Sequence, residues 1–251
     1  SLPTVDLTGR KVLFDAANGA AFEAGKSVLI SAGADVYAVA SDPTGRNIND
    51  GVGAMHPPSD LAGCDLGICL DGDGDRLVLI DPIHGVLDGD DLLWILAGHY
   101  PGTVVGTVMA NGGLEAALNG RLLRTGVGDA KVHAEMKRVG ALVGGEPSGH
   151  IMIATGMPTS DGMYTAMRIL EATATTSLPV EGWVRLPQEN RNIKNAILDP
   201  NLDAIREAER CGHRVLVRAS GTEPVIRVMV EGVDAAQWVE RIAETLPRAT
   251  D

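Results

Sequence analysis

Short apolar runs alternate with amphipathic stretches along the first two thirds of the chain. Residues 11–14 and 66–70 have the length and aliphatic content of buried strands, whereas residues 20–32 have helical spacing and stop at Gly33. Further strands are expected at 36–39, 77–80, 104–108, 121–125, 141–143 and 150–153, and helices at 90–97, 114–118, 129–139 and 161–173. Strands that alternate with helices predict a parallel or mixed sheet whose functional loops follow the carboxyl ends of its strands.

The remaining pattern divides the chain into three parts. Residues 41–59 show little periodicity and are expected to form a long loop, and the small, polar residues 173–179 are typical of a linker. Beyond this linker we expect a helix near 202–210, strands at 215–218 and 225–230, and a helix from Asp234. The predicted fold class is α/β, with two α/β domains at 1–84 and 85–178 followed by a small α+β domain at 179–251.

Composition narrows the function classes. The formal net charge of −12 disfavours nucleic acid and anionic membranes as partners. No apolar run approaches ~18 residues and no signal-peptide pattern opens the chain, so we expect no membrane segment. Three scattered cysteines without a C-x-x-C motif favour a cytoplasmic location. The charge is uneven, because residues 185–251 carry ten basic against eleven acidic side chains. Nine of those ten are arginine, which predicts an anion site near the C-terminal end.

Three aspartates alternate with glycine directly after the strand expected at 66–70. Such a loop can fold so that Asp71, Asp73 and Asp75 face one centre, and oxygen ligands at this density suit Mg²⁺ or Ca²⁺. An EF-hand is excluded, because its sixth position is Arg76 instead of glycine and its twelfth is Pro82 instead of glutamate. A plain turn of solvated acids is disfavoured, because the carboxylates repel one another without a cation.

Arg76 follows the acidic residues immediately. Its guanidinium is expected to reach a phosphate that the metal also contacts, and a salt bridge within the loop is the alternative.

A second candidate site is the turn Arg-Ala-Ser-Gly-Thr-Glu-Pro at 218–224. The turn and its flank offer two arginines, two hydroxyls and a glycine that lets backbone N–H groups approach closely, which together suit a phosphate dianion. These residues are Arg218, Ser220, Gly221, Thr222 and Arg227. An ordinary hydroxyl-rich turn is the alternative. The run at 19–27 is not a P-loop, because five residues instead of four separate its glycines.

A third candidate is the loop Gly-Gly-Glu-Pro-Ser-Gly-His at 144–150. A serine hydrolase is disfavoured, because a nucleophile elbow needs glycine two residues before the serine, where Glu146 stands. The carboxylate of Glu146, the hydroxyl of Ser148 and the imidazole of His150 suit hydrogen bonding to several sugar hydroxyls. For His150 the alternative is an imidazole that is satisfied within the core.

The three loops occur one per expected domain, and their combination resembles the α-D-phosphohexomutase superfamily. Its bacterial branch that acts on glucosamine phosphates is the most similar. That similarity rests on residues 15–20 (DAANGA), 47–51 (NINDG) followed by His56-Pro57, 105–109 (VGTVM) and 127–129 (VGD). The resemblance covers nearly the whole chain.

The resemblance implies an isomerase of the intramolecular phosphotransferase type. Such an enzyme interconverts glucosamine 6-phosphate and glucosamine 1-phosphate through a bisphosphorylated sugar, for the synthesis of UDP-N-acetylglucosamine and the cell wall. Mg²⁺ would be held by Asp71, Asp73 and Asp75, with Arg76 as the catalytic residue beside the transferring phosphoryl group. The implied substrate-binding residues are Glu146, Ser148 and His150 for the sugar, and Arg218, Ser220, Gly221, Thr222 and Arg227 for the phosphate that does not react.

Some features depart from the superfamily pattern. The phosphoserine of these enzymes lies in a first domain, in a Ser-His-Asn-Pro segment that this sequence lacks. We therefore expect a missing N-terminal domain to act in cis or in trans, and the chain alone to lack turnover. Gly126 and Ala130 stand where a lysine and an arginine are common, with Lys131 adjacent as a candidate substitute. The stretches 56–66 and 180–195 are each about one helix short.

Two other functions stay open at this point. One is a phosphomannomutase or phosphoglucomutase, which residues 47–50 disfavour. The other is a non-catalytic protein that binds sugar phosphates, which the substitutions at Gly126 and Ala130 favour.

Overall fold

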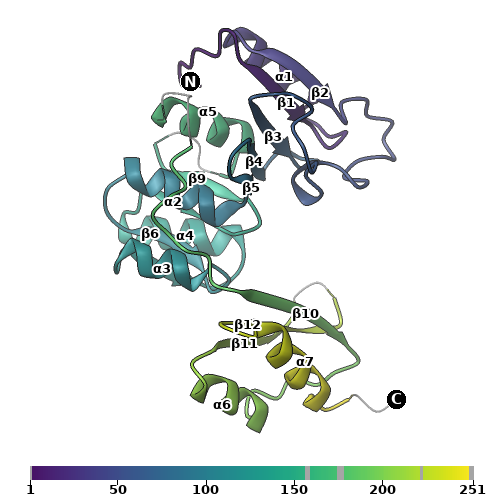
Figure 1. The fold of residues 1–251 in the computed structure, drawn as a ribbon, viewed down its shortest axis with the longest axis vertical. Coiled ribbons are helices and arrows are strands. Elements are labelled where there is room, and N and C mark those ends of the chain that lie inside the picture. Colours follow the sequence, from purple (N-terminus) through teal and green to yellow (C-terminus); the bar gives the residue numbers. More distant parts are fainter. Residues whose placement is uncertain (1, 156–158, 174–177, 221–222, 249–251) are drawn as a thin grey trace. The chain divides into compact units, whose positions relative to one another are not determined.

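The computed structural model describes residues 2–155, 159–173, 178–220 and 223–248 (Figure 1). The first sheet has the strand order β2-β1-β3-β4-β5. Strands β1, β2 and β3 are parallel, β4 is antiparallel to β3, and β5 is antiparallel to β4. Its elements are β1 (Lys11–Asp15), α1 (Phe22–Ser31), β2 (Asp35–Val39), the 3₁₀ turn η1 (Gly53–Met55), β3 (Leu66–Leu70), β4 (Leu77–Asp81) and β5 (Gly85–Leu87). The parallel or mixed sheet expected from the alternating pattern is confirmed.

The second sheet has the order β7-β6-β8-β9, with β9 antiparallel to β8 and the other pairs parallel. Its elements are α2 (Gly89–His99), β6 (Val104–Thr107), α3 (Gly112–Leu118), β7 (Leu122–Thr125), α4 (Asp129–Val139), β8 (Val143–Gly145) and β9 (Ile151–Ile153). A capping box starts α2, because Asp88 accepts from the Asp91 N–H while Asp91 accepts from the Asp88 N–H. The amphipathic α4 ends at Gly140, which adopts a left-handed φ of 69°.

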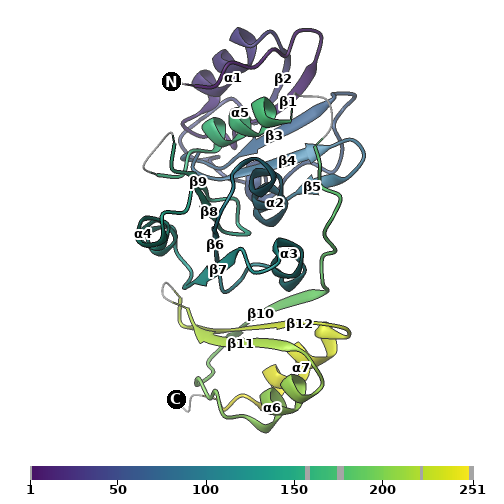
Figure 2. The same cartoon turned by 90° about the vertical axis from the view of Figure 1, so that its left-hand side faces the viewer.

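Helix α5 (Gly162–Ala172) lies against the first sheet (Figure 2). It follows β9 of the second sheet in sequence, yet it packs on β3 and β4 of the first sheet as well as on β9. The approach is close at its first turn, where a Cβ on Gly162 would lie 2.5 Å from the Arg76 carbonyl oxygen. Residues of both sheets therefore share one core, and residues 1–110 and 114–183 form one compact unit. The domain boundaries at 84 and 178 stay a prediction.

The connection from β2 to β3 contains η1 and no other helix, and all of its residues, 40–65, are described. It covers one face of the first sheet with a small apolar cluster of Ala54 and Leu61 against Cys69, Val78 and Ile80. The long loop expected at 41–59 is thus confirmed, apart from the single 3₁₀ turn.

A second compact unit comprises residues 111–113 and 184–251. Its antiparallel sheet has the order β10-β12-β11, and its elements are β10 (Gln188–Lys194), α6 (Asp203–Arg210), β11 (Arg214–Ala219), β12 (Val225–Glu231) and α7 (Ala235–Thr245). Both helices pack with β10, β11 and β12 around a separate apolar core. The predicted α+β arrangement is confirmed, but β10 was not expected from the sequence. Its residues are exposed except Ile193 and the partly buried Gln188, so they carry no apolar alternation.

Candidate functional site

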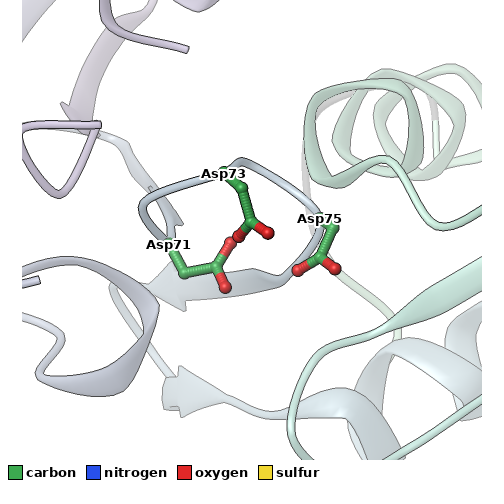
Figure 3. A group of neighbouring side chains, drawn as sticks. All are labelled: Asp71, Asp73 and Asp75. Carbon is green, nitrogen blue, oxygen red and sulfur yellow. The ribbon is translucent and has the colours of Figure 1, made fainter. Parts of the chain in front are cut away.

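The acidic loop between β3 and β4 gathers its three carboxylates (Figure 3). One oxygen each of Asp71, Asp73 and Asp75 lies within 4.8 Å of the other two. Asp71 is the buried member, at 6% exposure, and Asp73 is exposed. Burial, together with the negative charges of its two neighbours, raises the pKa of Asp71. A compact set of three carboxylate oxygens is the donor set of a hard divalent cation, so the residues fit the metal site predicted from the sequence.

Backbone contacts shape this loop. The Gly74 N–H donates to the Asp71 carbonyl (3.1 Å), and Gly74 adopts φ +77°, which a residue with a side chain reaches only with strain. The Arg76 N–H donates to Asp71 Oδ1 (3.1 Å), and its Nε lies 3.4 Å from Asp71 Oδ2. The salt bridge considered for Arg76 is therefore present, although Arg76 also has other partners.

The Gly-rich loop between β8 and β9 forms a second polar group. Glu146 is buried, and its Oε1 accepts from the Gly128 N–H (3.0 Å). Its Oε2 lies 3.2 Å from His150 Nδ1, and the Ser148 hydroxyl lies 3.3 Å from that same nitrogen. The bond to Glu146 raises the pKa of His150. The imidazole is thus held by residues of its own loop, and its side chain is 14% exposed.

A backbone bridge between Arg76 and His150 joins the two loops. His150 Nε2 lies 3.1 Å from Asp75 Oδ1 and 3.2 Å from Arg76 Nε, so it donates to the first or accepts from the second according to its tautomer. Seven predicted site residues consequently lie close together, although they belong to loops of two different sheets. They are Asp71, Asp73, Asp75, Arg76, Glu146, Ser148 and His150. Arg76 Nη1 also lies 2.9 Å from Met55 Sδ. Met55 was not expected at the site from the sequence.

A cavity of about 530 Å³ opens beside the acidic loop, between α1 and the start of α5. Asp73 and Asp75 line this cavity together with apolar residues, among them Ala21, Gly25 and Met163. The cavity leaves room for a ligand next to the carboxylates.

The predicted phosphate turn lies in the second compact unit, between β11 and β12. Arg218 and Arg227 are cross-strand partners in this antiparallel pair. Like charges placed opposite each other destabilise a sheet, and an anion bound between them would remove that penalty. Glu223 lies 3.4 Å from Arg227, and the Ser220 N–H donates to the Val225 carbonyl (2.9 Å). Gly221 and Thr222 lie outside the described residues.

The candidate substitute Lys131 also has a defined place. Its Nζ lies 3.1 Å from the position that a Cβ on Gly126 would occupy. The Lys131 ammonium therefore lies directly beside Gly126. Gly128 in the same turn contacts Glu146, so this turn borders the Gly-rich loop.

Two family models match the chain. "Phosphoglucomutase/phosphomannomutase, alpha/beta/alpha domain III" matches residues 88–189, and "Phosphoglucomutase/phosphomannomutase, C-terminal domain" matches residues 181–248. The phosphoglucosamine mutase of Halorhodospira halophila is 42% identical over 269 residues, which cover 96% of this chain and 59% of that protein. A phosphoglucosamine mutase of Thermus thermophilus is also 42% identical, over 96% of this chain and 60% of its own length.

The chain is shorter than these relatives, both overall and within the aligned region. The chain spans about 60% of the length of the curated relatives it matches. The alignment with the Halorhodospira protein is also longer than the 251 residues of this chain, so that relative contains internal segments that this chain lacks. The expected shortening relative to the superfamily agrees with this difference, although the alignment length does not locate the segments.

Solved structures show the same fold. The N-acetylphosphoglucosamine mutase of Aspergillus fumigatus, in complex with GlcNAc-6P and magnesium, matches with a TM-score of 0.74 at 20% identity, over 94% of this chain and 66% of its own. A phosphoglucomutase/phosphomannomutase family protein of Burkholderia thailandensis matches with a TM-score of 0.70 at 20% identity, over 95% of this chain and 62% of its own. With its two domain models, its relatives and its fold in agreement, the chain belongs to the phosphoglucomutase/phosphomannomutase family of α-D-phosphohexomutases.

Proposed function

We propose that this chain carries the metal, sugar and phosphate sites of a phosphoglucosamine mutase. The observation that carries the proposal is the bridge between Arg76 and His150, which brings the acidic loop and the Gly-rich loop together. A cation held by the acidic loop would therefore lie beside groups that suit hydrogen bonding to sugar hydroxyls. The relatives at about 40% identity are phosphoglucosamine mutases, which favours glucosamine phosphates over mannose or glucose phosphates as the substrate.

The reacting end of the substrate would lie at the acidic loop. Asp71, Asp73 and Asp75 would hold Mg²⁺, which supplies charge neutralisation for phosphoryl transfer when it is bound. Arg76, whose guanidinium lies beside Asp71 and His150, would stabilise negative charge on the transferring phosphoryl group. Both bonds already orient that guanidinium.

The sugar would bind at the Gly-rich loop. The Glu146 carboxylate would accept hydrogen bonds from the sugar hydroxyls, and the Ser148 hydroxyl would donate to them. His150 would hold both side chains in place. The phosphate that does not react would bind at Arg218 and Arg227, with Ser220, Gly221 and Thr222 in the same turn.

The phosphoryl carrier is part of the proposal. Because the sequence contains no Ser-His-Asn-Pro segment, a serine domain supplied in cis or in trans would complete the site. The proposed domains are 1–84 for the metal, 85–178 for the sugar and 179–251 for the phosphate. We further propose a cytoplasmic location without a nucleic acid or membrane partner. In the described part of the chain, no helix is long and apolar enough to cross a bilayer.

Titration calorimetry with glucosamine 6-phosphate in the presence of Mg²⁺ tests the function. We expect binding to the 251-residue chain, and weaker binding of mannose 6-phosphate and glucose 6-phosphate. Addition of a family serine domain that carries its phosphoserine is expected to restore turnover. Absence of turnover in that mixture, with binding intact, would favour a non-catalytic sugar-phosphate-binding protein. Absence of binding altogether would refute the substrate assignment.

The arginine pair can be tested separately. Arg218→Ala is expected to weaken the binding of glucosamine 6-phosphate by roughly 10- to 100-fold, because a charge-assisted bond to the phosphate is lost. Binding of neutral glucosamine should not change. Arg206→Ala, which removes an exposed arginine of α6 in the same unit, is the matched control. Equal losses for the charged and the neutral sugar would contradict a phosphate role for Arg218.

Lys131 is also expected to contribute to the binding of glucosamine 6-phosphate. Lys131→Met removes the ammonium that stands over Gly126 and should weaken the binding of glucosamine 6-phosphate by about fivefold, as expected for one exposed charged contact. Lys137→Met alters an exposed lysine in the last turn of the same helix, α4, and should have no effect. If both variants bind equally well, the ammonium of Lys131 does not substitute for the missing basic side chain.

A further inference from the structure

Asp15, the last residue of β1, is a buried carboxylate that the proposed chemistry does not use. It is 3% exposed, and both of its oxygens accept backbone bonds: Oδ1 from the Ala17 N–H and Oδ2 from the Gly53 N–H, each at 2.9 Å. Among the ion pairs of the described residues, none includes Asp15. Burial raises the pKa of this carboxyl, and its two backbone bonds oppose that shift.

The two bonds connect loops that are distant in sequence. Ala17 lies in the turn that leads from β1 to α1, and Gly53 opens η1 after the long loop. A third bond reinforces the connection, because the Asn49 N–H donates to the Ala17 carbonyl (2.9 Å). Ala17, Asn18 and Asn49 all adopt left-handed backbone angles, with φ of 52°, 48° and 57°. Asparagine tolerates such angles better than most residues, whereas for Ala17 they are unfavourable and persist only where the surroundings hold them.

The 16–20 turn and the 48–53 loop both pack against the backbone of the acidic loop. The Ala20 N–H donates to the Gly72 carbonyl (2.8 Å), and a Cβ on Gly19 would lie 2.2 Å from that oxygen. From the other loop, a Cβ on Gly72 would lie 2.6 Å from Ile48 Cδ1 and 2.8 Å from Asn49 Nδ2. Gly72, between the first two aspartates, is therefore enclosed by the two loops that Asp15 ties together.

We propose that Asp15 is a positioning residue of the cation site, which holds the 16–20 turn and the 48–53 loop against Gly72 and so fixes the backbone of Asp71 to Asp75. The inference rests on the proposed cation site. Asp15 is not one of the three aspartates whose oxygens gather in the acidic loop, and its own oxygens accept from the Ala17 and Gly53 N–H groups. Positioning groups of this kind strongly affect metal affinity, since they orient the ligands without touching the ion.

Asp15→Asn tests the proposal in the 251-residue chain. The substitution places an amide nitrogen against one of two backbone donors, so one loop is released while the side-chain volume stays the same. The matched control is Asp81→Asn at the opposite end of the same sheet. Asp81 is also buried, and its Oδ1 accepts from the Ile83 and His84 N–H groups in the β4–β5 hairpin.

The readout is the Mg²⁺ dissociation constant, measured by competition with luminescent Tb³⁺, together with the melting temperature. We expect Asp15→Asn to lower the melting temperature, and Asp81→Asn to lower it less, because the amide oxygen of asparagine can still accept both backbone bonds. Asp15→Asn should weaken Mg²⁺ binding by roughly tenfold, and Asp81→Asn by less than about twofold. Equal changes in Mg²⁺ affinity for the two variants would overturn the positioning role.

Asp73→Asn separates this inference from the proposed function. If that substitution leaves the Mg²⁺ affinity unchanged, the cation site itself is wrong. If it weakens binding while Asp15→Asn behaves as its control, the cation site stands and the positioning role of Asp15 fails.

Hydrogen exchange of the unaltered chain tests the proposal even if Asp15→Asn does not fold. Because binding and loop order are reciprocally coupled, Mg²⁺ should slow exchange of the Ala17, Ala20 and Gly53 amides by about fivefold or more. The Ile83 and His84 amides, which bond to Asp81, should exchange at an unchanged rate. Unchanged exchange at all five amides, with Mg²⁺ bound, would contradict the proposal.

Discussion

Replacement of Asp73 by asparagine is expected to weaken Mg²⁺ binding by roughly 100-fold, about 2.7 kcal/mol, because one of three anionic ligands loses its charge. Asp73 is the exposed member of the triad, so its substitution should leave the folded structure intact. The loss of repulsion among the carboxylates should even stabilise the cation-free chain slightly. Calorimetric titration with Mg²⁺, accompanied by a thermal melt in EDTA, measures both effects.

Asp35→Asn provides the control for this prediction. Asp35 is an exposed aspartate at the start of β2, at the end of the strand remote from the acidic loop, and its substitution changes the net charge equally. It should leave Mg²⁺ affinity within about twofold, since exposed charges at that range are largely screened. Equal affinities of the Asp73 and Asp35 variants would show that the acidic loop does not hold the cation.

The largest loss of stability is expected for Glu231→Ala in the C-terminal unit. Glu231 is 3% exposed, and its carboxylate accepts from Arg214 Nε (3.0 Å), Arg214 Nη2 (2.8 Å) and the Gly112 N–H (2.9 Å). Truncation removes three hydrogen bonds and takes the buried carboxylate away from the Arg214 guanidinium. We expect the free energy of unfolding of this unit to fall by about 3 kcal/mol, near the lower end for a buried pair, because Arg214 is 30% exposed.

Hydrogen exchange at β11 and β12 amides measures this change within the unit itself. Glu207→Ala is the matched control, because Glu207 pairs with Arg241 at the surface of the same unit. Exposed pairs contribute at most about 1 kcal/mol, so the control should exchange nearly as the unaltered chain does. If the Glu231 variant loses no more protection than the Glu207 variant, the buried pair does not stabilise the unit.

Local periodicity was sufficient for most elements. The helix expected at 161–173 forms as α5, and the strand expected at 66–70 forms as β3 with the same bounds. Periodicity identifies which face of an element is apolar but not which element covers it, so the packing of α5 on the first sheet was not predictable. Strand β10 was not predicted, because its sequence has no apolar periodicity. That sequence, QENRNIK, is polar except for Ile193, and its pairing with β12 makes it a strand.

The candidate site shows the same division. The residue types and their order identified three loops, because carboxylates indicate cation binding, and hydroxyls and arginines indicate hydrogen bonding to a sugar or a phosphate. The acidic loop and the Gly-rich loop meet through long-range contacts, among them the backbone bridge between Arg76 and His150. No local pattern in the sequence encodes such contacts. The contribution of Asp15 was equally hidden, because its partners are backbone N–H groups of residues that lie far apart in the sequence.

The path of α5 has a consequence for biosynthesis. The apolar side chains of Ile68, Leu70, Leu77 and Leu79 share a core with those of Met163 and Met167, which a ribosome adds much later. At about 5–20 residues per second, the interval between β3 and α5 lasts on the order of 5–20 s. During that time the nascent sheet displays an apolar face and the acidic loop lacks the close contact of Arg76 with Gly162. Chaperone binding to the nascent chain should therefore begin with the exit of β3 from the ribosome and end with that of α5.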